Sequence, residues 1–97
     1  MRVKLIIVFR EYSTGDMEYE EEKARISRDH TILMEPQLKT TITLEDGMVF
    51  FIHKLNQNLQ TNVVELTQYS DVPYYKNRNN EIEHSLEEYE NRGWSIE

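Results

Sequence analysis

The dipeptide Asp46-Gly47 constrains the fold of this chain more than any other feature of its sequence. It separates Thr40–Leu44 from Val49–Ile52, two runs that are rich in β-branched and aromatic residues. Asp-Gly is among the pairs favoured in the tight turns of β-hairpins, because glycine adopts positive φ without a steric penalty. We therefore predict an antiparallel hairpin over these two runs.

The predicted register of this hairpin follows from a turn of two residues. Leu44 then lies opposite Val49, and Ile42 lies opposite Phe51. These four side chains share one face, which we assign to the core. The alternate side chains of the second strand, Phe50 among them, project from the opposite face.

The first strand is predicted at Arg2–Tyr12, where apolar residues alternate on one face while Ile6 and Val8 add apolar groups to the other. Turn residues follow at Ser13–Asp16, and the chain returns through Met17–Ile26. The apolar positions of the returning segment match neither a single strand face nor a helical stripe. A strand with a bulge would reconcile them, as would a strand followed by a helical turn. We predict the strand.

The last third of the sequence predicts one well-delimited helix. Asn80 is a suitable N-cap, and Gly93 stands where a left-handed residue ends a helix. Between them, Ile82, Leu86 and Tyr89 recur at helical spacing and form a narrow apolar stripe. The tryptophan that follows the glycine is placed to fold back onto the last turn.

These elements predict an α+β fold in one domain spanning residues 1–97. A further strand is expected from about Thr61 to Tyr69, because that segment is also rich in β-branched residues. We expect an antiparallel sheet of four to five strands, a meander with hairpins, packed by the C-terminal helix. A chain of 97 residues is too short to bury the core of a second domain.

The composition limits the classes of protein to which this chain can belong. It contains no cysteine, so disulfide scaffolds, thiolate metal sites and cysteine nucleophiles are excluded. Its 18 acidic and 11 basic residues give a net charge of −7, which argues against direct nucleic-acid binding. The longest apolar run, Leu5–Phe9, is far shorter than the ~20 residues of a membrane-spanning helix. We therefore expect a cytoplasmic protein without a membrane partner.

Patterns typical of catalysis or metal binding are weak. Glu81, His84 and Glu88 share one side of the predicted helix, but a carboxylate-bridged metal site needs a matching set from another helix. His30 and His53 fall on other elements. The serines lack a nucleophile elbow, and the three glycines supply no phosphate-binding loop. We therefore predict no catalytic residue, no metal site and no cofactor, in a protein that is not an enzyme.

Acidic residues and tyrosines are the most unusual feature of the sequence. In the predicted helix, glutamates border the apolar stripe on both sides, and several stand near the C-terminus, where the helix dipole disfavours negative charge. Exposed tyrosines are effective interface anchors, because they bury a rigid ring and keep a polar tip. The candidate partner-binding residues are Glu20, Glu21, Glu22, Tyr74, Tyr75, Glu81, Glu83, Glu87, Glu88 and Glu90. The alternative is that the glutamates only maintain solubility and the tyrosines cover sheet edges.

This combination favours a small protein–protein interaction module. Carboxylates on successive turns of a helix stand about 6 Å apart, a spacing comparable to that of phosphates along a nucleic-acid strand. We therefore hypothesise an inhibitor, in the style of phage or mobile-element proteins. It would occupy the nucleic-acid-binding surface of a basic partner such as a nuclease or DNA-binding protein. A self-associating structural or assembly protein is the alternative, and a ligand-binding protein or small-molecule enzyme is a third class.

The distribution of apolar residues also predicts self-association. In the register given above, Ile6, Val8, Phe50 and Ile52 form a patch on a sheet face that a single helix cannot cover. Either the segment Glu18–Glu35 folds across this patch, or a second copy covers it about a two-fold axis. We favour the homodimer, because the glutamates of that segment make a poor apolar cover.

Overall fold

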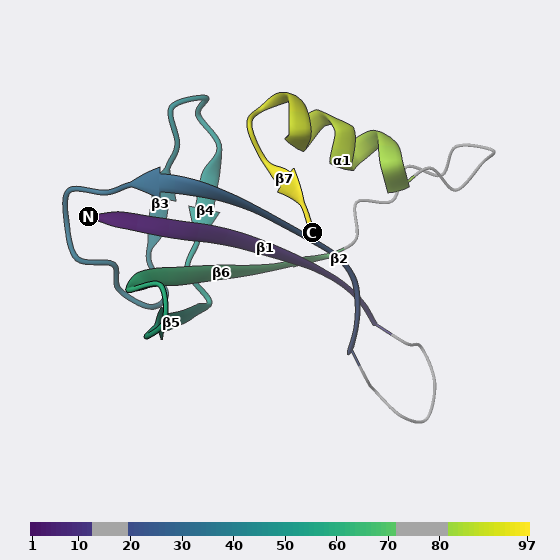
Figure 1. The fold of residues 1–97 in the computed structure, drawn as a ribbon. Coiled ribbons are helices and arrows are strands. Elements are labelled where there is room, and N and C mark those ends of the chain that lie inside the picture. The colour runs from purple at the N-terminus through teal and green to yellow at the C-terminus, as the bar shows by residue number, and fades with distance from the viewer. Residues whose placement is uncertain (13–19, 72–81) are drawn as a thin grey trace.

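The computed structural model describes residues 1–12, 20–71 and 82–97, which form strands and a helix arranged as in Figure 1. In chain order the elements are β1 (Arg2–Tyr12), β2 (Glu20–Thr31), β3 (Thr41–Thr43), β4 (Val49–Phe51), β5 (Lys54–Asn58), β6 (Val63–Asp71), α1 (Ile82–Asn91) and β7 (Ser95–Ile96). The broad α+β class predicted from the sequence fits this arrangement, although strands dominate it. Within these ranges, no helix is long and apolar enough to cross a membrane.

The main sheet has five strands in the order β5-β6-β1-β2-β7, with β1 at its centre. β1 pairs antiparallel with β2 but parallel with β6, so the predicted purely antiparallel meander is wrong. The reason lies in the connection from β2 to β6, which carries the β3–β4 hairpin across one face of the sheet (Figure 1). β6 therefore arrives on the other side of β1 and runs in the same direction, which requires a long crossover rather than a tight turn.

The pairing of β1 with β2 confirms the predicted strand with a bulge. Phe9 pairs with Ala24, but the next pair of the ladder joins Arg10 to Glu22, so that Lys23 is an extra residue. One inserted residue reverses the alternation of side chains along a strand. This accounts for the broken apolar pattern in the sequence. The predicted turn that precedes β2 lies outside the described residues.

The predicted Asp46-Gly47 hairpin is present, but its register differs by one residue from the predicted one. The pairs are Thr41–Phe51, Ile42–Phe50 and Thr43–Val49. Leu44 N donates to Met48 O at 2.8 Å and Gly47 N donates to Leu44 O at 3.0 Å, so the loop holds three residues rather than two. Gly47, with φ of 86°, is the left-handed residue that such a loop requires. The Asp46 side chain accepts a hydrogen bond from Met48 N at 2.9 Å and stabilises the longer loop.

This shift of one residue reverses the two faces of β4. Phe50 and Ile52 point into the core with 0% and 1% of their surface exposed, whereas Val49 is 55% exposed. On the other face of the main sheet, Ile6 and Val8 are only 6% and 4% exposed. The prediction that these residues form an exposed apolar patch is therefore wrong.

The core lies between one face of the main sheet and a second layer, which is made by the β3–β4 hairpin and α1 (Figure 1). The odd-numbered residues of β1 from Val3 to Phe9 line the sheet side. They are joined by Ile26, Leu44, Phe50, Ile52, Leu66, Leu86 and Trp94. Each large apolar side chain gains about 1.5–3 kcal/mol on full burial. The helix thus covers only part of the sheet face, and the hairpin covers the rest.

The helix ends as predicted at Gly93. Gly93 N donates to Glu90 O and Trp94 N donates to Tyr89 O, each at 3.0 Å. With φ of 93° at Gly93, these two bonds form a Schellman motif. Trp94 is 3% exposed, and its ring meets that of Tyr89 edge-on with centroids 6.2 Å apart. The predicted N-cap Asn80 lies outside the described residues.

Candidate protein-binding surface

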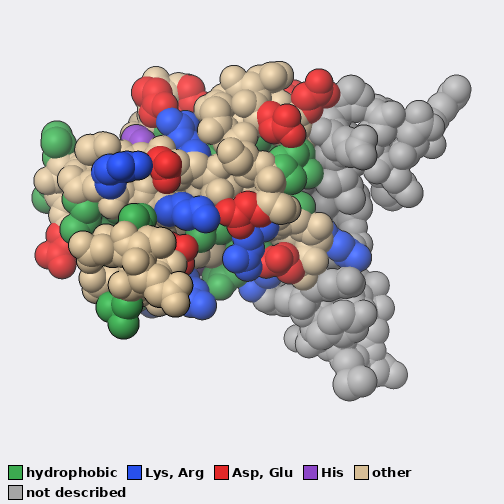
Figure 2. All heavy atoms as spheres, in the orientation of Figure 1, with side chains coloured by type: hydrophobic (Ala, Val, Ile, Leu, Met, Phe, Trp, Pro, Cys, Tyr) green, Lys and Arg blue, Asp and Glu red, His purple; other side chains and the backbone are tan. Residues whose placement is uncertain are grey.

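Three of the predicted partner-binding glutamates lie together on α1. Glu87, Glu88 and Glu90 are exposed, while Leu86 is buried and Tyr89 packs against the core. The helical period explains this division, because the apolar stripe turns inward. Figure 2 shows acidic side chains gathered along the rim of the molecule where α1 and the β3–β4 turn lie. We term the three glutamates the acidic helix surface.

The other predicted binding residues do not extend this surface among the residues that the structure describes. Glu22 of β2 accepts a hydrogen bond from Arg25 at 2.7 Å, so its charge is paired. The remaining candidates lie outside the described part of the chain, either as whole residues (Tyr74, Tyr75 and Glu81) or by their side chains (Glu20, Glu21 and Glu83). The candidate surface is therefore built on α1.

Arg92, the first cation that follows these glutamates in the sequence, is paired elsewhere. In the described ranges, Glu88 and Glu90 form no ion pair, and the last turn of α1 contains no basic residue. Arg92 instead reaches the turn between β3 and β4, where its Nη1 lies 3.9 Å from Asp46 Oδ2. The partial negative charge at the C-terminal end of the helix adds to the charge of the glutamates.

Several carboxylates near the main sheet, by contrast, have cationic partners. Glu97 lies 2.9 Å from Lys4 Nζ, and Arg28 donates a hydrogen bond to Glu45. The Arg28 guanidinium holds the pKa of Glu45 below its ordinary value, because it favours the charged carboxylate. Glu88 and Glu90 differ from these sites, because no ion pair joins them to another of the described residues.

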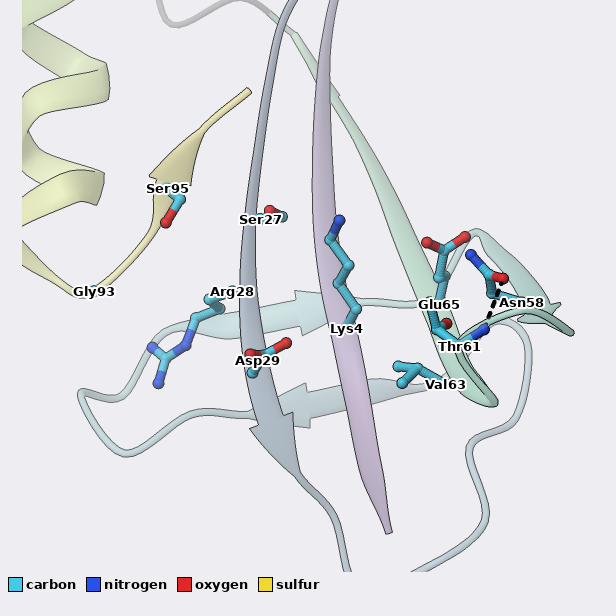
Figure 3. A pocket seen from close by; sticks show the side chains of 10 residues that line it. All are labelled: Lys4, Ser27, Arg28, Asp29, Asn58, Thr61, Val63, Glu65, Gly93 and Ser95. Carbon is cyan, nitrogen blue, oxygen red and sulfur yellow. Dashed lines mark hydrogen bonds between the residues drawn. The ribbon is translucent and has the colours of Figure 1, made fainter.

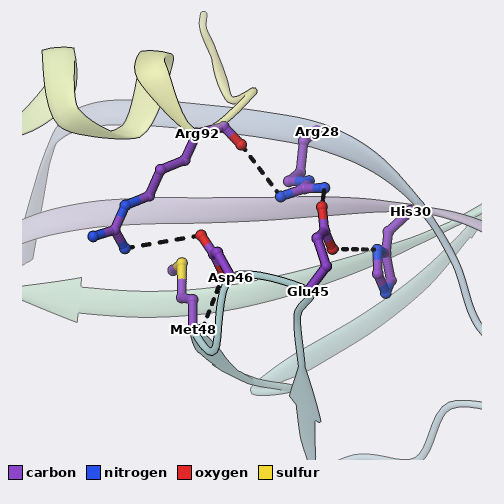
Figure 4. A network of polar contacts seen from close by, with 6 residues as sticks. All are labelled: Arg28, His30, Glu45, Asp46, Met48 and Arg92. Atoms are coloured by element: carbon purple, nitrogen blue, oxygen red, sulfur yellow. Dashed lines mark hydrogen bonds and ion pairs between the residues drawn. The ribbon is translucent and has the colours of Figure 1, made fainter.

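A polar network ties the C-terminal end of α1 to the β3–β4 turn (Figure 4). Arg28 of β2 hydrogen-bonds Glu45 and also donates to Arg92 O at 3.4 Å. Its guanidinium carbon lies 5.7 Å from the centre of the Trp94 ring. Together with the contact between Arg92 and Asp46, these interactions link the residue that follows α1 to β2 and to the β3–β4 turn. In the sequence, only the adjacent acids Glu45 and Asp46 hint at this network, because their partners Arg28 and Arg92 come from distant segments.

The open face of the main sheet carries a polar trough of about 670 Å³ (Figure 3). Its lining includes Lys4, Ser27 and Glu65. Ser27 Oγ donates to Glu97 Oε1 at 2.7 Å. The Lys4 ammonium and the Ser27 hydroxyl hold the pKa of Glu97 below its ordinary value. A carboxylate of lowered pKa is a weak base, so this pair does not give an activated serine nucleophile.

His53 lies where the chain passes from β4 to β5, and it contacts β6. Its Nδ1 accepts a hydrogen bond from Tyr69 N at 3.1 Å, and its ring lies 4.5 Å from that of Phe51. Across residues 1–12, 20–71 and 82–97, no group of three or more histidines or carboxylates is arranged to hold a metal ion. The side chains of Glu81 and His84, considered above for a metal site, lie outside the described part.

Comparison of the chain with protein-family models, with curated proteins and with solved structures finds no match in any of the three. A fold by itself assigns no activity, because one fold hosts many functions. The functional assignment therefore rests on the chemistry of the described surface.

Proposed function

We propose that the protein is a protein-binding module whose acidic helix surface occupies the basic, nucleic-acid-binding surface of a partner protein. The supporting observation is the charge of Glu88 and Glu90 at the negative end of α1, where neither forms an ion pair with another described residue. Stability alone favours Lys or Arg there, because each adverse charge costs about 0.3–1 kcal/mol. Contact with a cationic partner would offset that cost.

The anchored helix end suits recognition of a site that normally binds phosphates. Because Arg28 and Arg92 tie this end to the β3–β4 turn, little conformational freedom is lost when a partner docks. Carboxylates one turn apart on a helix are separated by about 5–6 Å and can take neighbouring phosphate positions. A nuclease or DNA-binding protein blocked in this way would be inhibited in the style of phage or mobile-element proteins, in the cytoplasm where such partners act.

Capture followed by competition tests this function. The full chain is immobilised, and a cell lysate is passed over it at low ionic strength. We expect retention of a basic protein that is released between about 0.1 and 0.5 M salt, as the charges are screened. Excess duplex DNA should displace the same protein, because both would bind one surface. A retained protein that resists both salt and DNA would contradict the proposed function.

A further inference from the structure

The outer edge of β3 is open. Leu44 N donates to Met48 O and Ile52 N donates to Thr40 O, so the even-numbered residues here bond toward β4. Because backbone groups alternate in direction along a strand, the N–H and C=O of Thr41 and Thr43 point to the opposite edge. In the described part of the chain, no strand pairs with that edge.

An apolar groove of about 470 Å³ lies beside this strand. The segment that follows β2 forms its other side and contributes Ile32, Leu33 and Met34, while Ile42 and Ile52 line the hairpin side. Leu33 is fully exposed, at 101%, and Met34 is 81% exposed. Large apolar side chains in such positions are typical of interaction sites.

Hydrogen bonds hold both walls of the groove in place. Met1 and Ile32 exchange two backbone bonds, of 2.9 and 3.0 Å, which fix the segment after β2 to the start of β1. On the hairpin side, Lys39 N donates to Ile52 O at 2.8 Å, and Thr40 Oγ1 donates to Gln37 O at 2.6 Å. The groove is therefore formed before any partner arrives.

The size of the apolar surface identifies the kind of occupant. Leu33, Met34 and Leu38 are the large exposed apolar residues of this segment. Full burial of one such side chain is worth about 1.5–3 kcal/mol, at about 25 cal/mol for each Å² of apolar surface. Three side chains therefore offer roughly 200–350 Å² of apolar surface. A stable dimer buries about 800 Å² on each partner, of which roughly 450 Å² is apolar. This surface is too small for a second copy and suits a short peptide segment.

We propose that the open edge of β3 and this groove bind an extended segment of a partner protein by strand addition. Main-chain hydrogen bonds to Thr41 and Thr43 would supply affinity, and alternate apolar side chains of the segment would enter the groove. The site is separate from the acidic helix surface. Tyr89 of α1 contacts Phe9 near the far end of β1, with ring centroids 5.6 Å apart. The groove adjoins Met1 at the other end of β1, and no residue of α1 lines it.

A peptide library tests the main-chain part of this proposal. Random eight-residue peptides displayed on phage are selected on the immobilised full chain, and the most enriched peptide is synthesised for fluorescence anisotropy. We expect apolar residues at alternate positions. Methylation of the backbone amides that face β3 should weaken binding at least tenfold, whereas methylation of the intervening amides should not. Failure to enrich any peptide, or equal effects of both methylation patterns, would overturn strand addition.

Matched variants test the position of the site. Leu33→Asp should weaken the selected peptide at least tenfold, because it places a charge in the groove. Leu59→Asp is the control, since Leu59 is 86% exposed and does not line the groove; it should change binding less than twofold. Thr43→Pro removes one outward N–H from an edge strand without removing a bond to β4, and it should weaken binding to a similar extent as Leu33→Asp. Equal effects of the two Asp variants would refute the assignment.

Two further measurements separate this site from other possibilities. The triple variant with Glu87→Gln, Glu88→Gln and Glu90→Gln should leave the peptide affinity unchanged. A failed prediction for the groove can then be distinguished from a failed prediction for the acidic helix surface. Sedimentation equilibrium of the free chain should show a monomer of 11.7 kDa. A dimer that Leu33→Asp dissociates would assign the groove to a second copy and overturn the peptide occupant.

Discussion

Replacing Phe50 with alanine is expected to lower the free energy of unfolding by about 3–5 kcal/mol. Phe50 is 0% exposed, and its ring is stacked near that of Trp94 with centroids 6.5 Å apart. The substitution removes this contact and leaves a cavity between the hairpin and the main sheet. Urea denaturation followed by circular dichroism measures the loss, which is a large share of the 5–15 kcal/mol typical of a folded domain.

The neighbouring residue provides the matched control. Val49 lies on the same short strand but is 55% exposed, so Val49→Ala should change the stability by less than about 0.5 kcal/mol. A two-residue turn would place Val49 in the core and Phe50 outside. If Val49→Ala proved the more damaging of the two substitutions, the register described for the hairpin would be wrong.

Replacing Trp94 with alanine is expected to cost about 3–5 kcal/mol as well. Its ring is 3% exposed and contacts Tyr89 of the helix, Phe50 of the hairpin and the Arg28 guanidinium. Loss of these contacts should release the end of α1 and with it the orientation of the acidic helix surface. Thermal unfolding gives the stability, and the far-ultraviolet spectrum reports the helix.

Ile96 is the control for this second prediction. It lies two residues further along the chain and is 45% exposed, so Ile96→Ala should cost less than about 1.5 kcal/mol. A Trp94→Ala variant no less stable than the Ile96→Ala variant would show that the tryptophan does not join α1 to the core.

The parts of the fold that were predicted from the sequence are those with local causes. β1 follows from the alternation within Arg2–Tyr12, and the end of α1 follows from a glycine that adopts the left-handed conformation. The broken apolar pattern of β2 was compatible with a bulge or with a strand followed by a helical turn. The pairing on either side of Lys23 shows the bulge.

The register of the Asp46-Gly47 hairpin could not be predicted with the same security. Glycine with positive φ serves a three-residue loop as well as a two-residue turn, and the choice depends on which faces the core accepts. Leu44, Phe50 and Ile52 all become buried only in the observed register. The parallel pairing of β6 with β1 likewise depends on long-range packing.

The candidate surface also has a part that the sequence predicts and a part that it does not. The exposure of Glu87, Glu88 and Glu90 follows from the helical period. The hydrogen bond from Arg28 to Arg92 O joins residues 64 positions apart in the chain. No local pattern predicts such a contact, so the sequence indicates the charged surface but not its anchoring.

Association kinetics test the central claim, that the acidic helix surface carries partner recognition. The association rate of the captured partner is measured by stopped flow for the wild type and for the Glu87→Gln, Glu88→Gln and Glu90→Gln triple variant. A control combines Asp29→Asn, Glu65→Gln and Asp71→Asn, which change the net charge equally on residues that lie on neither α1 nor the groove. We expect the helix variant to associate at least ~10-fold more slowly at low salt, with the difference fading near 0.5 M. The control should stay within about threefold of the wild type.

A helix variant that associates as fast as the wild type at low ionic strength, or a control that slows to the same extent, would contradict the account.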